Sequence, residues 1–135
     1  MINDKLTKEL QEQITENKDD INIIKNNSVY STSETICGTW NGKPLYRKTF
    51  SGNLGQTSTI NHGISNIDLV ISIHGSYKNT ETGTQFNIPS VRPAVNNYEI
   101  GIYANQSTIT FDKAPGISGD MLIFNVIMEY TKTTD

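Results

Sequence analysis

Four side chains have the chemistry of a saccharide-binding site, in which aromatic rings stack on sugar faces and fixed polar groups contact the hydroxyls. Tyr103 is expected on the polar face of its strand, and Tyr77 opens a polar loop. Trp40 flanks a predicted turn. Arg92 is one of only two arginines and could pair with a carboxylate or phosphate group. We therefore predict ligand binding by Tyr77, Arg92, Tyr103 and Trp40. Each also has a structural alternative, namely packing in the core or between subunits.

A zinc site would need the only cysteine, Cys37, and the two histidines, His62 and His74. These residues lack the short ligand spacings of known zinc sites. Cys37 fits better as a small hydrophobic residue in the core. We therefore expect no metal and no cofactor.

Hydrolysis of a polysaccharide would need a pair of carboxylic acids, and Asp68, Glu99 and Asp112 are the candidates. Scattered carboxylates in a β-rich domain are usually solvated surface groups. The sequence also contains neither a Gly-x-Ser-x-Gly elbow nor a phosphate-binding glycine loop. We therefore expect no catalytic residues and regard the protein as a non-enzyme, with a polysaccharide-degrading activity as a third possibility.

Composition excludes several classes of protein. The chain has 135 residues, and 11 basic against 14 acidic residues give a formal charge of −3, which argues against nucleic-acid binding. No apolar run is long enough to cross a membrane, and the first residues do not resemble a signal peptide. One cysteine cannot form an intrachain disulfide. We expect a protein that is made in the cytoplasm and does not insert into membranes.

The chain divides into two parts of different composition. Residues 1–27 hold 10 of the 25 charged residues and are rich in helix formers, whereas every glycine and proline lies at or after Gly38. Residues 28–135 are rich in β-branched and turn residues. We predict a helical stalk over 1–27 and a β-rich head domain over 28–135.

The stalk carries the pattern of a coiled coil. Thr7, Ile14 and Ile21 occupy heptad position a, and Leu10, Asn17 and Ile24 occupy position d. A single helix of this length is marginal in water, and isoleucine at both positions favours three or four strands over two. Asn17 would place a polar layer in the seam. The alternative is one amphipathic helix packed on the head.

The head shows the alternation of antiparallel strands. Segments 34–40 and 43–50 flank Asn41-Gly42, a pair that favours a type I′ hairpin turn. Further strands are expected at 67–74, 98–103, 107–111 and 122–130. The last strand is apolar on both faces near Ile123 and Ile127, which predicts a cover on each side. We therefore predict an antiparallel β-sandwich or jelly-roll-like head.

Three segments of the head resemble one family. They are the run from Gly38 to Lys48 (GTWNGKPLYRK), the run from Gly63 to Asp68 (GISNID) and the ending from Glu129 to Asp135 (EYTKTTD). Together they resemble the C-terminal head domain of fibre proteins from phages that infect Gram-positive and gut bacteria. This resemblance covers residues 30–135.

The resemblance implies a homotrimeric head on a virion appendage, either a tail fibre or a capsid fibre. It implies a role in host attachment through a cell-surface glycan or cell-wall polymer. The alternative is a purely structural domain that trimerises or caps the fibre. The residues predicted at the trimer interface are Leu10, Ile14, Asn17, Ile21, Ile24, Ile123 and Ile127.

Overall fold

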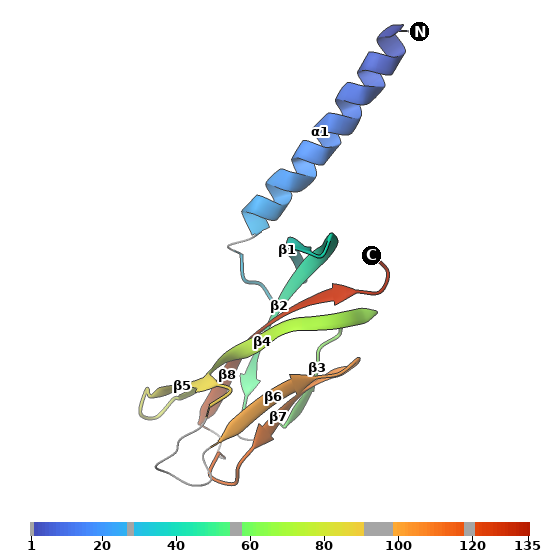
Figure 1. Cartoon of the computed structure of the whole chain (residues 1–135). Helices are drawn as coiled ribbons and strands as arrows, with labels where there is room; N and C mark the ends of the chain where they lie inside the picture. Colours follow the sequence, from blue (N-terminus) through green and yellow to red (C-terminus); the bar gives the residue numbers. More distant parts are fainter. Residues whose placement is uncertain (1, 27–28, 55–57, 91–98, 118–120) are drawn as a thin grey trace.

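The computed structural model describes residues 2–26, 29–54, 58–90, 99–117 and 121–135, and within the helix it describes the side chains of residues 3–21. The protein is mainly β, with antiparallel sheets and one N-terminal helix, as the sequence predicted (Figure 1). No helix in these ranges is long and apolar enough to cross a membrane. The elements, in chain order, are α1 (Ile2–Asn26), β1 (Thr35–Trp40), β2 (Lys43–Asn53), β3 (Thr59–Asn61), β4 (Ile67–Asn79), β5 (Gln85–Ile88), β6 (Ile100–Ala104), β7 (Thr108–Lys113) and β8 (Leu122–Lys132).

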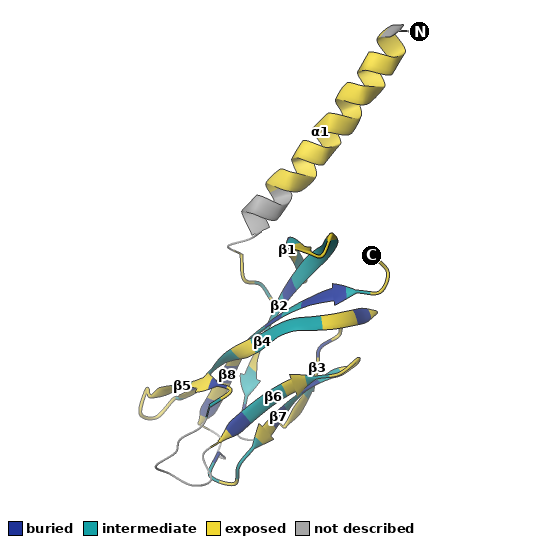
Figure 2. Ribbon diagram, viewed as in Figure 1, coloured by how far each residue is buried: buried dark blue, intermediate teal, exposed yellow. Residues whose placement is uncertain are grey.

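Helix α1 projects away from the head (Figure 1). Asp4 in its first turn interacts favourably with the helix dipole, and no glycine or proline interrupts it. Every side chain from Asn3 to Ile21 is exposed (Figure 2). Over this part of the helix, the alternative of packing against the head is therefore wrong.

Five strands form the larger sheet, in the order β1-β2-β8-β4-β5, and all neighbours are antiparallel. The turn between β1 and β2 has positive φ angles at Asn41 (49°) and Gly42 (80°). Both central residues of a type I′ turn need such angles, so the predicted hairpin is confirmed.

The smaller sheet has the order β3-β7-β6 and faces the larger one across a shared core (Figure 1). Phe111 of β7 and Phe124 of β8 pack with ring centroids 4.7 Å apart. On β8, Phe124, Val126 and Met128 are buried, because alternate residues of a strand face the same side. Asn125 and Ile127, which alternate with these buried residues, therefore lie on the outer face of the larger sheet.

Several strand boundaries differ from the predicted ones. Strand β4 continues to Asn79, because its far half pairs with both β5 and β8. Strand β6 begins at Ile100, and Tyr98 lies outside the described residues. Strand β7 runs two residues further than expected, to Lys113. These differences come from strand pairing, which local alternation does not specify.

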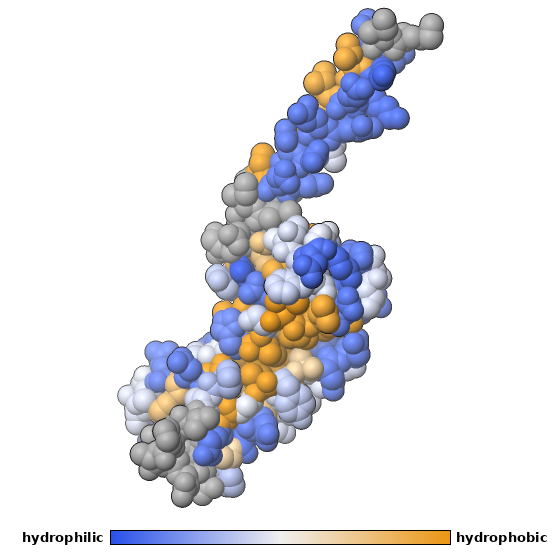
Figure 3. Space-filling view, viewed as in Figure 1, coloured by the Kyte–Doolittle hydropathy of each residue, from blue (hydrophilic) through white to orange (hydrophobic). Residues whose placement is uncertain are grey.

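Half of β4 forms an open sheet edge. In the described part of the chain, β5 pairs with β4 only from Gly75 to Lys78, so the segment 67–74 has β8 alone as its neighbour. Leu69 on this segment is 51% exposed, and Val70 and Ile73 are only partly buried. Figure 3 shows apolar surface gathered along this part of the head.

Candidate functional site

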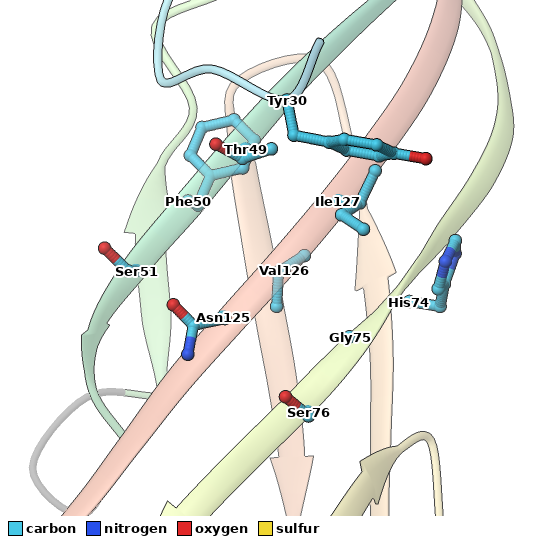
Figure 4. A pocket seen from close by; sticks show the side chains of 10 residues that line it. All are labelled: Tyr30, Thr49, Phe50, Ser51, His74, Gly75, Ser76, Asn125, Val126 and Ile127. Carbon is cyan, nitrogen blue, oxygen red and sulfur yellow. The ribbon is translucent and has the colours of Figure 1, made fainter. Parts of the chain in front are cut away.

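A groove lies on the outer face of the larger sheet, across β2, β8 and β4 (Figure 4). Strand pairing places Thr49, Ile127 and His74 in one row across the three strands. Ser51, Asn125 and Ser76 form the next row. The groove has a volume of about 460 Å³. Its lining residues are Tyr30, Thr49, Phe50, Ser51, His74, Gly75, Ser76, Asn125, Val126 and Ile127.

Tyr30 forms the aromatic wall of this groove. Its ring stands above the sheet beside Ile127, and its side chain is 59% exposed (Figure 4). Two contacts fix the segment that carries it: the Thr49 amide donates to the Ser31 carbonyl oxygen at 2.9 Å, and Arg47 Nη1 donates to the Val29 carbonyl oxygen at 3.4 Å. The Tyr30 ring is therefore held in place although it is exposed.

A buried charge cluster lies beneath the Tyr30 ring. The Arg47 guanidinium carbon is 4.3 Å from the ring centroid, a cation–π contact, and its Nη2 donates to Glu129 Oε2 at 3.5 Å. Cys37 Sγ is also 3.5 Å from Glu129 Oε2. Burial is the main cause that raises the pKa of the Cys37 thiol, so this group stays neutral at physiological pH. Arg47 and Glu129 form the row next to Thr49 and Ile127 on the same outer face, so the charge of Arg47 is balanced at the end of the groove behind Tyr30.

The floor of the groove combines Ile127 and His74 with short polar side chains. Ser51, Ser76 and Asn125 each offer both hydrogen-bond donors and acceptors. Among the described lining residues there is no carboxylate, lysine or arginine. Such a surface can bind hydroxyl-rich molecules, and among the described lining residues only the His74 imidazole could offer a charge to a strongly ionic ligand.

Gly75 keeps this floor narrow. A Cβ atom at this position would lie 2.0 Å from the carbonyl oxygen of Asn125 and 2.8 Å from the Cα of Val126. Only glycine allows the backbones of β4 and β8 to approach so closely. The spacing of Ser76 from Asn125 therefore depends on Gly75.

The structure does not bring the four predicted ligand-binding residues together. Tyr77 is only 3% exposed and stacks on Phe86 at 4.9 Å, which fits the alternative of packing in the core. Trp40 is 41% exposed on β1, and Tyr103 is 54% exposed on β6 of the other sheet. Arg92 lies outside the described residues.

The three residues considered for zinc are also separate. His62 is buried: its Nδ1 accepts from the Ile64 amide at 3.1 Å, so the proton lies on Nε2, which is 2.9 Å from the Asn105 carbonyl oxygen. His74 is exposed on β4, and Cys37 lies on β1. Within the described residues, no group of three or more possible metal ligands occurs.

Of the candidate carboxylates, Asp68 lies on the larger sheet, whereas Glu99 and Asp112 lie at the paired strands β6 and β7 of the smaller sheet. Asp68 on β4 forms an ion pair with Lys43 at 3.0 Å. Glu99 precedes β6 and Asp112 lies on β7, and both are exposed. Asp68 therefore has a local role of its own, which does not involve the other two.

The residues predicted at the trimer interface fall in two places. Leu10, Ile14, Asn17 and Ile21 are exposed on α1, and the side chain of Ile24 lies outside the described ones. Ile123 is 41% exposed on the outer face of β8, and Ile127 forms part of the groove floor. Their contacts with other subunits remain predictions.

Sequence reasoning missed Tyr30 and the polar rows of the groove. Alternation did indicate that Asn125 and Ile127 share one face of β8. However, only the register of β2, β8 and β4 places Ser51 and Ser76 beside them. No sequence signal connects Tyr30 with this sheet.

Comparison with known proteins identifies no relative: no protein-family model, curated protein or solved structure matches this chain.

Proposed function

We propose that the protein is part of a homotrimeric phage fibre, in which a coiled-coil stalk carries a β-sandwich, jelly-roll-like head that takes part in host attachment. The ligand would be a glycan or cell-wall polymer on the host surface. The chain would be made in the host cytoplasm and would function in the virion. Support comes from the sequence resemblance, from the two sheets that face each other across one core, and above all from helix α1.

The exposed apolar stripe of α1 is the observation that carries this proposal. Leu6, Leu10, Ile14 and Ile21 are each about half exposed, with values from 48% to 58%. At about 100° per residue, these side chains and Asn17 fall within about 80° of the helix circumference. A narrow stripe of this kind is the seam of a coiled coil, and it needs other copies to become buried.

The alternative function is a structural one, in which the domain trimerises or caps the fibre without a ligand. The open edge of β4 favours this alternative in one respect. Leu69 and the neighbouring apolar side chains leave an apolar sheet edge, which proteins usually cover. A cover from a second subunit would bury this edge in the same assembly that buries the helix stripe.

Two measurements test the proposal. Light scattering on the purified chain should give about three times 15.0 kDa, and a fluorescent trimer should adsorb to some strains in a panel of Gram-positive and gut bacteria. A double substitution, Leu10→Glu with Ile14→Glu, should abolish the trimer, because it places charges in the seam. A monomeric parent chain would overturn the proposal, whereas a trimer that adsorbs to no strain would favour the structural alternative.

A further inference from the structure

The groove on the outer face of the larger sheet combines one exposed aromatic ring with Ile127, His74 and short polar side chains that include no carboxylate, lysine or arginine among the described residues. Its volume of about 460 Å³ lies within the range of small-ligand sites, about 300–1,000 Å³. We propose that this groove binds one uncharged sugar residue, with the Tyr30 ring stacked on the sugar and the floor residues bonded to its hydroxyls. This inference rests on the proposed function and names the ligand class and the site.

The aromatic ring of the groove matches the C–H face of a sugar, and its polar side chains match the sugar hydroxyls. A pyranose ring presents a face of C–H groups, which carry partial positive charge and pack on the negative face of an aromatic ring. Its hydroxyls both donate and accept hydrogen bonds. Ser51, Ser76 and Asn125 do the same, so each hydroxyl can find a partner in more than one orientation.

The charge of the site selects an uncharged ligand. The described lining residues include no carboxylate, lysine or arginine. Arg47 lies under the Tyr30 ring and pairs with Glu129, so it does not face the ligand. A uronic acid or a phosphate would lose water on entry and would find no lysine or arginine in the described lining, where His74 is the one side chain that can carry a positive charge, which disfavours its binding.

The site is formed before the ligand arrives. The floor residues lie on three paired strands, and Gly75 sets the distance between two of them. Backbone hydrogen bonding through Ser31 and the cation–π contact with Arg47 hold the Tyr30 segment. A pre-formed site loses little conformational entropy on binding, which partly compensates for its shallow shape.

One such site should bind weakly, with a dissociation constant of about 1 mM. In the proposed trimer, three sites acting on one repeating polymer could exceed this affinity by about 10²-fold. Attachment would then depend on the assembly as well as on the groove.

The test is ligand-observed NMR on the intact chain. The neutral probes are the methyl glycosides of glucose, galactose and N-acetylglucosamine, each at about ten times the expected dissociation constant. The charged probes are glucuronic acid and inorganic phosphate. We expect at least one neutral probe to bind and both charged probes to bind more weakly.

Single substitutions locate the binding. Tyr30→Ala should weaken it by about tenfold, because the stacking face is lost, and Tyr30→Phe should keep it. Asn125→Ala should also weaken sugar binding, because it removes hydrogen-bonding groups from the floor of the groove. Tyr103→Ala tests the rival site on the other sheet, since it removes a tyrosine of similar exposure (54% against 59%). Met121→Ala is the control, because Met121 is 52% exposed and does not line the groove, and it should leave binding unchanged.

Several outcomes would overturn the inference. One is that no neutral probe binds, and another is that the charged probes bind best. A third is that Tyr103→Ala abolishes binding while Tyr30→Ala does not, which would move the site to the smaller sheet and leave the proposed function standing. A fourth is that Tyr30→Ala dissociates the trimer, which would make the groove a subunit contact, in agreement with the interface prediction for Ile127.

Discussion

Replacing Gly75 with alanine should destabilise the head strongly, because this residue allows two central strands to approach each other. The new Cβ atom would lie 2.0 Å from the Asn125 carbonyl oxygen, whereas real Cβ atoms essentially never come closer than 3.0 Å to another heavy atom. Strands β4 and β8 would therefore have to move apart by about 1 Å at this point.

The size of the effect follows from that displacement. Moving the strands by about 1 Å stretches the flanking ladder hydrogen bonds beyond about 3.2 Å, and each lost bond costs about 1 kcal/mol. Overpacking of this kind adds about 1–3 kcal/mol. We expect a loss of about 3–5 kcal/mol in the free energy of unfolding, against a total of about 5–15 kcal/mol for a typical domain.

Urea unfolding, followed by circular dichroism at one protein concentration, measures this loss. With a slope of about 1–3 kcal/mol per molar urea, the midpoint should fall by about 2 M. The control is Gly101→Ala on β6, where the added Cβ would meet only Asp112 Cβ at 3.7 Å, an ordinary contact. This control should stay within about 1 kcal/mol of the parent or gain slightly.

A midpoint for Gly75→Ala within about 0.5 M of the parent would refute the reasoning. It would mean that β4 and β8 do not approach as closely as described. Equal losses in Gly75→Ala and Gly101→Ala would also refute it, because the effect would then come from glycine in any strand and not from this contact.

Two further predictions concern the stalk and the C-terminal end. Asn17→Ile should raise the Tm by several degrees, since each chain would bury an isoleucine worth about 2 kcal/mol in place of a polar layer; an unchanged or lower Tm would show that the heptad register is wrong. A hydrogen bond of 2.7 Å from the Tyr46 hydroxyl to Asp135 Oδ2 raises the pKa of Tyr46 from 10.0 to about 12. The folded state thus holds this proton more tightly than the unfolded state, so the stabilisation is complete below pH 10 and is lost as the pH rises towards 12. Urea midpoints should fall less steeply with pH over this interval in Tyr46→Phe than in the parent, and parallel curves would contradict the prediction.

The sequence alone was sufficient for the elements that depend on local chemistry. Residues 1–27 contain helix formers without glycine or proline, and α1 extends from Ile2 to Asn26. Asn41-Gly42 tolerates the positive φ angles of its turn, and the hairpin forms there. Alternation along β8 placed Phe124 and Val126 on one face and Asn125 on the other, and the structure shows that the first face is the inward one. Each of these features is encoded within a few residues, so a pattern can reveal it.

Tertiary pairing alone decided the features that join distant segments. The length of β4 depends on β5 and β8, and for this reason Tyr77 lies in the core and not at the start of a loop. The groove exists because the strand register places Ser51, Asn125 and Ser76 side by side. It also needs the segment before β1, which places the Tyr30 ring against Arg47. The groove contacts join residues 17 positions apart (Tyr30 and Arg47) to 74 positions apart (Ser51 and Asn125), and strand register is chosen by the total burial of a whole sheet. A local sequence pattern therefore cannot predict the strand register.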